Sequence, residues 1–344
     1  MKLVIRLIVV GVVGVVVLTG ALVGLLMFWS YHQTYLCEHD IGQPAVDACS
    51  KAIAAGGSGI WSDYNNRANA NMSLHRYKAA LADYDAAVRL NGKSAILYAN
   101  RGFLRVAMHD NAGALQDFDN ALWLQPRDAR TLQRRGEVYL VMDQYGLGIR
   151  DFNAALRLRP GDTAIIGDRG MAYLGLHQYD RAIRDFEAVG RSYPRNAAIA
   201  TFLSWSYAGR HQYDRAAQEA DQAIRLAPDA GHFNNGCWIR AIWGQQLDAA
   251  LADCNRALKL APKQAGFFET RALVELRRRA YIAAITDEDR AIAIGAEKPA
   301  AALYVRGLAK VKSGDRSGGE ADIAAAKKLE PLIADTYAGW GVKP

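Results

Sequence analysis

The chain of 344 residues is long enough for about two domains, and its 51% hydrophobic and 22% charged residues exclude a disordered or collagen-like protein. Its formal net charge of +7 is scattered evenly rather than gathered into a stripe, which argues against a nucleic-acid-binding protein. Four cysteines are too few for a small fold built on disulfides.

The first element in chain order is an uncharged run over residues 7–29, LIVVGVVGVVVLTGALVGLLMFW. As a helix this run would reach about 34 Å, which is enough to cross a bilayer core. Lys2 and Arg6 precede it, and no Lys or Arg follows before Lys51. The positive-inside rule therefore predicts a single-pass protein of the inner membrane, with residues 1–6 as a cytoplasmic stub and everything after residue 29 in the periplasm.

The alternative for this run is a cleaved signal peptide. A signal peptide has an apolar core of about 7–15 residues that ends in a small-x-small site. Here the apolar run is longer, and the small residues Gly20 and Ala21 lie in its middle. An uncleaved anchor is therefore favoured, and a lipoprotein is disfavoured because no Leu-x-Gly-type motif precedes Cys37.

Beyond residue 60 the prolines recur with a fixed period. Pro126, Pro160, Pro194, Pro228 and Pro262 each lie 34 residues from the next, and a fixed period of this size indicates a repeat architecture. With proline at position 32 of the repeat, the residue at position 20 is small in every copy and that at position 8 is small in most. Position 24 is Tyr or Phe in four copies. A close approach of two antiparallel helices explains this pattern, with the proline ending the second helix.

These spacings closely resemble those of the tetratricopeptide repeat. The resemblance covers residues 61–333, as eight copies that begin at residues 61, 95, 129, 163, 197, 231, 265 and 300. It implies an all-α solenoid of about eight helical hairpins wound as a right-handed superhelix. The sixth copy departs from the pattern with Trp238 at position 8, and the seventh lacks its terminal proline.

Two segments flank the predicted repeats. In the juxtamembrane segment, residues 30–60, Ala45, Cys49 and Ala52 repeat the spacing of positions 20, 24 and 27, so we expect a lone second helix that caps the stack. We expect the C-terminal tail, residues 334–344, to cover the other end. The N-terminal segment with its paired cysteines also resembles that of exported, membrane-anchored bacterial tetratricopeptide proteins.

Six copies carry an arginine at position 7 and an aspartate at position 23, which we expect to meet across the two helices of the hairpin. The pairs are Arg67 and Asp83, Arg101 and Asp117, Arg135 and Asp151, Arg169 and Asp185, Arg271 and Asp287, and Arg306 and Asp322. They could be acid–base sites or structural ion pairs. Repetition favours the structural role, because an active site is needed only once.

Histidines and cysteines are the other residues with possible chemistry. His75, His109, His177 and His211 all fall at position 15, in successive turns that helix packing keeps about 8–10 Å or more apart, so they cannot share a metal ion. In an oxidising compartment we expect the disulfides Cys37–Cys49 and Cys237–Cys254, with packing as free thiols as the alternative. No catalytic residue, metal site or cofactor motif is predicted, and we expect no enzyme activity.

The first helices of such repeats line the concave side, where positions 2, 5, 9 and 12 should face a groove. The resemblance implies that this groove binds a peptide or a partner helix. The predicted groove residues are Asn65, Asn69, Asn100, Arg130, Gln133, Arg134, Met171, Trp205, Asn235 and Trp243, with Asn66, Glu137, Leu174, Ile239 and Ile242 beside them. The tryptophans could instead pack between repeats.

The sequence thus predicts a membrane-anchored scaffold or adaptor that binds a protein or peptide partner on the periplasmic side, with no nucleic acid and no small-molecule substrate. The alternative is a non-catalytic accessory subunit of an envelope enzyme or secretion complex that uses its convex face and its transmembrane helix.

Overall fold

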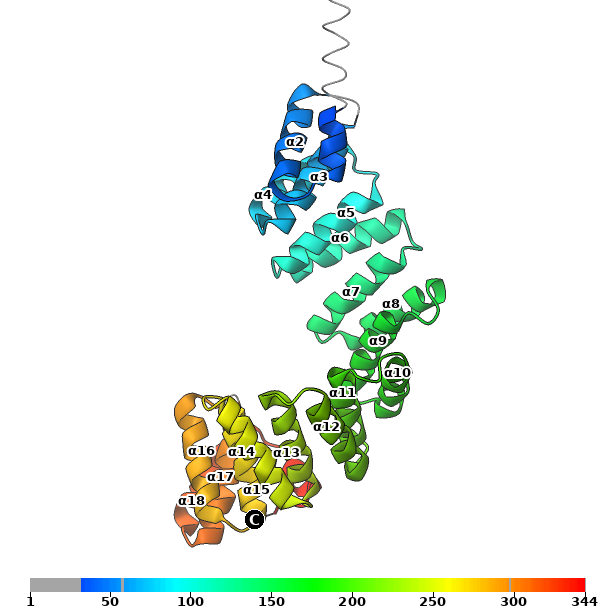
Figure 1. Ribbon diagram of the computed structural model, residues 1–344. Helices are drawn as coiled ribbons and strands as arrows, with labels where there is room; N and C mark the ends of the chain where they lie inside the picture. The colour runs from blue at the N-terminus through cyan, green and yellow to red at the C-terminus, as the bar shows by residue number, and fades with distance from the viewer. Residues whose placement is uncertain (1–31, 57–58, 297, 344) are drawn as a thin grey trace, which may run out of the picture. The chain divides into compact units, whose positions relative to one another are not determined.

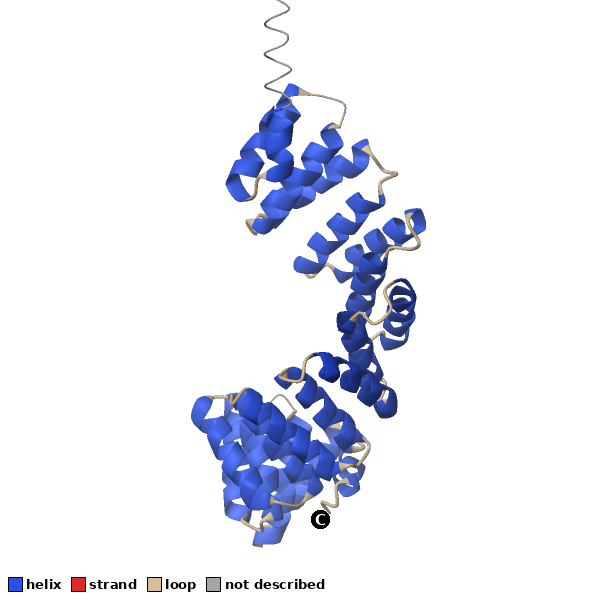
Figure 2. Ribbon diagram, turned by 45° about the vertical axis from the view of Figure 1, so that its right-hand side comes forward, coloured by secondary structure: helices blue, strands red, loops and turns tan. Residues whose placement is uncertain are grey.

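The computed structural model describes residues 32–56, 59–296 and 298–343, and within these ranges every regular element is a helix (Figures 1 and 2). The all-α prediction is confirmed. The predicted cytoplasmic stub and transmembrane helix, residues 1–29, lie outside the described residues. Each helix that the structure does describe is too short or too polar to span a bilayer.

The chain divides into two compact units, the first ending at Pro160 and the second beginning at Gly161. In the first unit, helix α2 (Gly42–Ala55) is followed by three antiparallel hairpins, which Figure 1 shows in blue to green. The hairpins are α3 (Ile60–Ser73) with α4 (Tyr77–Leu90), α5 (Ala95–Ala107) with α6 (Asn111–Leu124), and α7 (Ala129–Val141) with α8 (Tyr145–Leu158).

The second unit contains five more hairpins and a short terminal helix. The hairpins are α9 (Thr163–Gly175) with α10 (Tyr179–Ser192), α11 (Ala197–Gly209) with α12 (Tyr213–Leu226), α13 (Ala230–Trp243) with α14 (Leu247–Leu260), α15 (Ala265–Arg277) with α16 (Tyr281–Ile294), and α17 (Pro299–Ser313) with α18 (Arg316–Leu329). The terminal helix is α19 (Ile333–Gly339). Each first helix begins within one residue of the copy boundary expected from the proline period.

A glycine beneath an aromatic ring sets the close approach inside a hairpin. A Cβ atom added at Gly136 would lie 2.6 Å from the ring of Phe152, and one at Gly102 would lie 2.6 Å from that of Phe118. Both rings are fully buried. Glycine at position 8 therefore makes room for the position-24 ring of the same hairpin, so that the core of each hairpin lies between its two helices.

The N-terminal cap differs from the expected lone helix. Residues 32–39 are also helical, and the disulfide between Cys37 and Cys49 joins them to α2 with an S–S distance of 2.09 Å. Leu36 packs against this disulfide and Ala48. The short segment before α2 is too polar to bury much apolar surface, so the covalent link and this small cluster hold it in place.

The C-terminal tail also differs from a simple end cap. Helix α19 contacts α17 and α18, but its aromatic residues reach further back along the first helices. The ring of Trp340 lies 5.3 Å from that of Trp238 on α13, and Tyr337 lies 5.1 Å from Tyr304 on α17. The guanidinium of Arg277 on α15 donates to the Trp340 carbonyl. The tail therefore covers the first-helix side of the last three hairpins.

Candidate functional site

The first unit carries a pocket on the first-helix side of its hairpins. Its volume is about 380 Å³, and its lining includes Phe103, Val106, Val141, Arg130 and Arg134. We call it the inner pocket. Val141 is 72% exposed and Val106 38%, so this part of the surface offers apolar side chains to solvent.

Two guanidiniums lie over the aromatic ring of the inner pocket. The Arg130 guanidinium carbon is 4.9 Å from the Phe103 ring centroid, and that of Arg134 is 6.0 Å away. Arg134 also donates to Glu137 at 2.7 Å, whereas both arginines remain largely exposed. The pocket therefore combines an apolar floor with positive charge, which fits an apolar side chain next to a carboxylate.

The structure brings together all six predicted arginine–aspartate pairs. Each guanidinium donates from Nε and Nη2 to the two carboxylate oxygens of its own hairpin, over distances of 2.6–2.9 Å. Several of the arginines use Nη1 for a further bond to the preceding hairpin; in the first unit Arg101 binds Asp85 at 2.8 Å and Arg135 binds Asp119 at 2.7 Å. The pairs thus join neighbouring hairpins as well as the helices within one.

The sixth hairpin lacks the position-7 arginine but keeps the position-23 aspartate, Asp253, and it adds a disulfide to position 24. Cys237 occupies position 7 and is bonded to Cys254 with an S–S distance of 1.96 Å. Arg240, one helical turn further on, donates to Asp253 of the same hairpin at 3.1 Å and to Asp221 of the preceding one at 2.6 Å. The cationic bridge between hairpins is therefore kept, and Trp238 turns out of the hairpin interface toward Trp340.

Comparison with known proteins identifies the fold. No protein-family model and no curated protein sequence matches this chain. Among solved structures, a tetratricopeptide repeat protein from Parabacteroides merdae is 18% identical, with a TM-score of 0.59 over 74% of this chain and 99% of that one. This chain has the tetratricopeptide-repeat fold. The repeat prediction is therefore confirmed at the level of the fold.

Two further structures with the same hairpin architecture show comparable likeness. A chain of the APC/C hetero-tetramer Cut9–Hcn1 is 15% identical, with a TM-score of 0.56 over 77% of this chain and 52% of that one. PilW, a widely conserved type IV pilus biogenesis factor, is 16% identical, with a TM-score of 0.53 over 60% of this chain and 96% of that one. At these identities the likeness concerns the tetratricopeptide-repeat fold.

The early groove residues divide between solvent and the repeat core. Asn65 is buried, donates to Asn66 at 3.2 Å and accepts from Asn100 at 2.9 Å, so its amide is used between neighbouring repeats. Asn69 is exposed, but its side-chain oxygen accepts from the Tyr84 hydroxyl at 2.5 Å. The expected row of amides for a peptide backbone is therefore engaged in repeat contacts, while Arg130 and Arg134 remain accessible and Gln133 is half-buried.

The later groove residues are mostly covered. Trp205 is 43% exposed, and its Nε1 donates at 2.7 Å to Asn235, which is itself buried. Ile239 and Ile242 are buried rather than open to a groove, because this first helix packs on both sides against neighbouring repeats. Met171, Leu174 and Trp243 are half-buried. Among the later predicted groove residues, Trp205 offers the most surface to a partner.

The apolar part of the inner pocket was missed from sequence. Phe103 and Val106 lie at positions 9 and 12, which are predicted to face the groove, but the groove residues predicted in the early copies are all polar. Val141, at position 13, lies beside these positions. The signal was an aromatic and a valine at groove positions of the second copy, next to the two arginines of the third.

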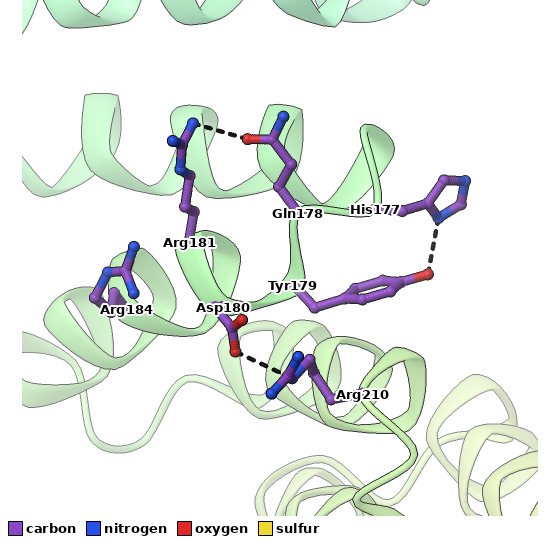
Figure 3. Close-up of a pocket in the computed structure, with 7 residues that line it drawn as sticks. All are labelled: His177, Gln178, Tyr179, Asp180, Arg181, Arg184 and Arg210. Carbon is purple, nitrogen blue, oxygen red and sulfur yellow. Dashed lines mark hydrogen bonds and ion pairs between the residues drawn. The ribbon is translucent and has the colours of Figure 1, made fainter.

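The position-15 histidines lie in exposed turns. All four have left-handed backbone conformations, with φ between 56° and 60°, which histidine tolerates better than most residues. Figure 3 shows the turn at His177, whose Nδ1 lies 2.8 Å from the Tyr179 hydroxyl beside a 470 Å³ depression. Two other pairs line this depression: Arg181 donates to Gln178 at 2.9 Å, and Arg210 lies 3.0 Å from Asp180. No metal-ligand cluster occurs in the described part of the chain.

Proposed function

We propose that this protein is a membrane-anchored scaffold that binds a segment of a partner protein in the inner pocket, on the periplasmic side. The observation that carries the proposal is the apolar floor of Phe103, Val106 and Val141 beneath Arg130 and Arg134. Arg134 also pairs with Glu137, and a partner carboxylate would compete for that bond or share it. The partner segment would place an apolar side chain on that floor and an acidic side chain against Arg130 and Arg134.

The fold supports a binding role of this kind. Stacked hairpins offer a long rigid surface, and the rigid backbone keeps the pocket residues in place before the partner arrives, which lowers the entropic cost of binding. PilW, a type IV pilus biogenesis factor, and a chain of the APC/C hetero-tetramer Cut9–Hcn1 share the hairpin architecture.

Two features support the periplasmic placement. The sequence before residue 30 has the length, apolarity and flanking charges of an anchor whose C-terminal side is exported. The two disulfides, Cys37–Cys49 and Cys237–Cys254, form and persist in oxidising compartments.

Site-specific photo-crosslinking in cells tests the inner pocket. A photoreactive residue in place of Val141 should give a partner adduct, and the same residue at the exposed turn residue Lys93 should give none. Charge reversal of the arginines, Arg130→Glu with Arg134→Glu, should weaken the adduct at least about tenfold, since two charge-assisted contacts are lost. A full-strength adduct in the charge-reversed variant, with an unchanged melting temperature, would rule the pocket out.

The same experiment distinguishes binding in the inner pocket from the alternative, an accessory subunit that binds through the second helices of its hairpins. Trp123 on α6 is 81% exposed, which favours a second contact surface on the second-helix side. A photoreactive residue at Trp123 that captures the partner while Val141 captures nothing would favour this alternative.

Membrane topology gives a separate prediction. The full chain should stay with membranes in alkaline carbonate and should be released when residues 7–29 are deleted, because this run alone supplies enough apolar surface for a span. A protease added to cells with a permeabilised outer membrane should digest the repeats. Protection of the repeats until the inner membrane is opened would show that the orientation is reversed.

A further inference from the structure

A buried glutamate stands in the core of the seventh hairpin where other hairpins carry an aromatic ring. Tyr84, Phe118, Phe152 and Phe186 fill position 24 of the first four copies and are essentially fully buried. Glu288 has the same position on α16 and is 0% exposed. A carboxyl group at a position built for a ring costs stability unless something specific satisfies it.

Both oxygens of Glu288 are buried without a hydrogen-bond partner. The side-chain oxygen of Asn234 on α13 is likewise buried and unpartnered. The two residues line the same cavity, of about 240 Å³, which lies wholly within the second unit and is lined by α13, α15, α16, α17 and α19. The Asn234 oxygen is a hydrogen-bond acceptor, and the Glu288 oxygens are acceptors only, with no proton to donate, when the carboxyl group is ionised. We therefore call it the acceptor cavity.

The rest of the lining combines aromatic rings with polar groups. Trp238 of α13 and Tyr337 of α19 provide rings, and Glu269 and Thr270 of α15 add a second carboxyl group and a hydroxyl. Lys298 also contributes to the lining, but its side chain is exposed, and no bond joins it to Glu288. Aromatic faces next to carboxylates are the surroundings in which proteins hold organic ammonium ions.

We propose that the acceptor cavity binds a small organic cation with N–H donors, a primary alkylammonium ion. Its ammonium protons would satisfy the unpartnered oxygens of Glu288 and Asn234, and its alkyl chain would lie against Trp238 and Tyr337. A quaternary ammonium ion has no N–H donors for these oxygens. A metal ion fits less well, since no group of three or more metal ligands occurs among the described residues.

The electrostatic surroundings support a cationic ligand. Burial raises the pKa of Glu288 well above its usual value, and the carboxylates Glu269 of α15 and Asp287 and Asp289 of α16 add to this effect, while Arg306 of α17 opposes it. Without a ligand the carboxyl is therefore held in its protonated form to a higher pH than an exposed glutamate. Binding of an ammonium ion would release that proton to solvent and leave a carboxylate–ammonium pair.

The position of α19 explains how such a ligand would be enclosed. Tyr337 of the tail lines the cavity. Burial raises the pKa of its hydroxyl group, and the nearby carboxyl groups of Glu288, Glu269 and Glu330 raise it further. Arg277 holds the tail in place through the Trp340 carbonyl. The tail thus closes a site that the repeats alone would leave open to solvent.

Titration of the full-length protein in detergent with butylammonium chloride tests this proposal, with calorimetry and Trp fluorescence as readouts. We expect saturable binding of butylammonium. Tetramethylammonium should bind at least about tenfold more weakly because it lacks N–H donors, and Mg²⁺ should do so because it needs more ligands. Glu288→Gln should weaken binding by at least a similar factor, while the control Glu320→Gln, an exposed residue of α18, should leave it unchanged.

The pH dependence gives a second readout. Affinity of the wild-type protein for butylammonium should rise with pH through the raised pKa of Glu288, and that of Glu288→Gln should stay flat. Absence of saturable binding, equal binding of tetramethylammonium, or unchanged binding in Glu288→Gln would each overturn the proposal. The inner pocket lies in the other unit, so these results bear only on the acceptor cavity.

Discussion

Replacement of Arg135 by alanine should destabilise the first unit by about 3 kcal/mol, which corresponds to a fall in its melting temperature of about 6–12 °C. Arg135 donates at 2.7 and 2.8 Å to both oxygens of Asp151 and at 2.7 Å to Asp119 of the preceding hairpin. The Asp151 side chain is only 8% exposed, so its carboxylate would be left without a counter-ion in a site that water reaches poorly. Circular dichroism during heating measures the effect.

The matched control is Arg150→Ala, an exposed arginine on helix α8 of the same hairpin, which should change stability by less than about 0.5 kcal/mol. The double variant Arg135→Ala with Asp151→Ala should recover much of the loss, because the unpaired carboxylate is gone as well. Equal effects of Arg135→Ala and Arg150→Ala would show that the ion pair contributes no more than a surface charge.

Loss of the disulfide in the sixth hairpin should lower the stability of the second unit by about 2–4 kcal/mol. Cys237 and Cys254 are fully buried, and their bond closes a loop between residues 17 apart. Replacing both by alanine removes the covalent link without leaving a polar group in the core. The unfolding transition of the second unit, followed through its tryptophans, should move to a lower denaturant concentration.

The comparison variant replaces Cys37 and Cys49 by alanine. That disulfide joins residues 12 apart in the first unit, so its loss should leave the transition of the second unit in place. Treatment of the wild-type protein with a thiol reductant should reproduce both effects. If reduction shifts neither transition, the disulfides make no contribution to stability.

The regular part of the fold could be predicted from the sequence because each residue that recurs with the 34-residue period has a structural role in the hairpin. Proline ends the second helix, a small residue lets the two helices approach, and an arginine and an aspartate at fixed positions meet across the hairpin. These relations are local, within one 34-residue copy, so a single sequence contains them several times over. The same locality explains why each first helix begins within one residue of the expected boundary.

Contacts between copies could not be predicted in the same way. The 34-residue period does not predict the bond from Arg101 to Asp85 of the preceding hairpin. It also does not predict that Arg240 joins the sixth hairpin to the preceding one. Amides such as Asn65 could face a ligand or a neighbouring repeat, and only the packed structure shows that the neighbour takes them. Glu288 lies at position 24, which is aromatic in four other copies, but only the packed structure shows the cavity that it lines.

The seam between the fourth and fifth hairpins has a more apolar centre than its neighbours, and its ion pair, Arg210 with Asp180, is exposed to solvent. At position 7 of the fifth hairpin Leu203 replaces the arginine, and the rings of Phe186 and Phe202 stack 5.1 Å apart beside it. High salt screens the exposed part of an ionic seam but strengthens an apolar one when the salt is of the kosmotropic kind. Sulfate should therefore strengthen the apolar contacts of this junction relative to the ionic contact of Arg240 with Asp221 at the next one.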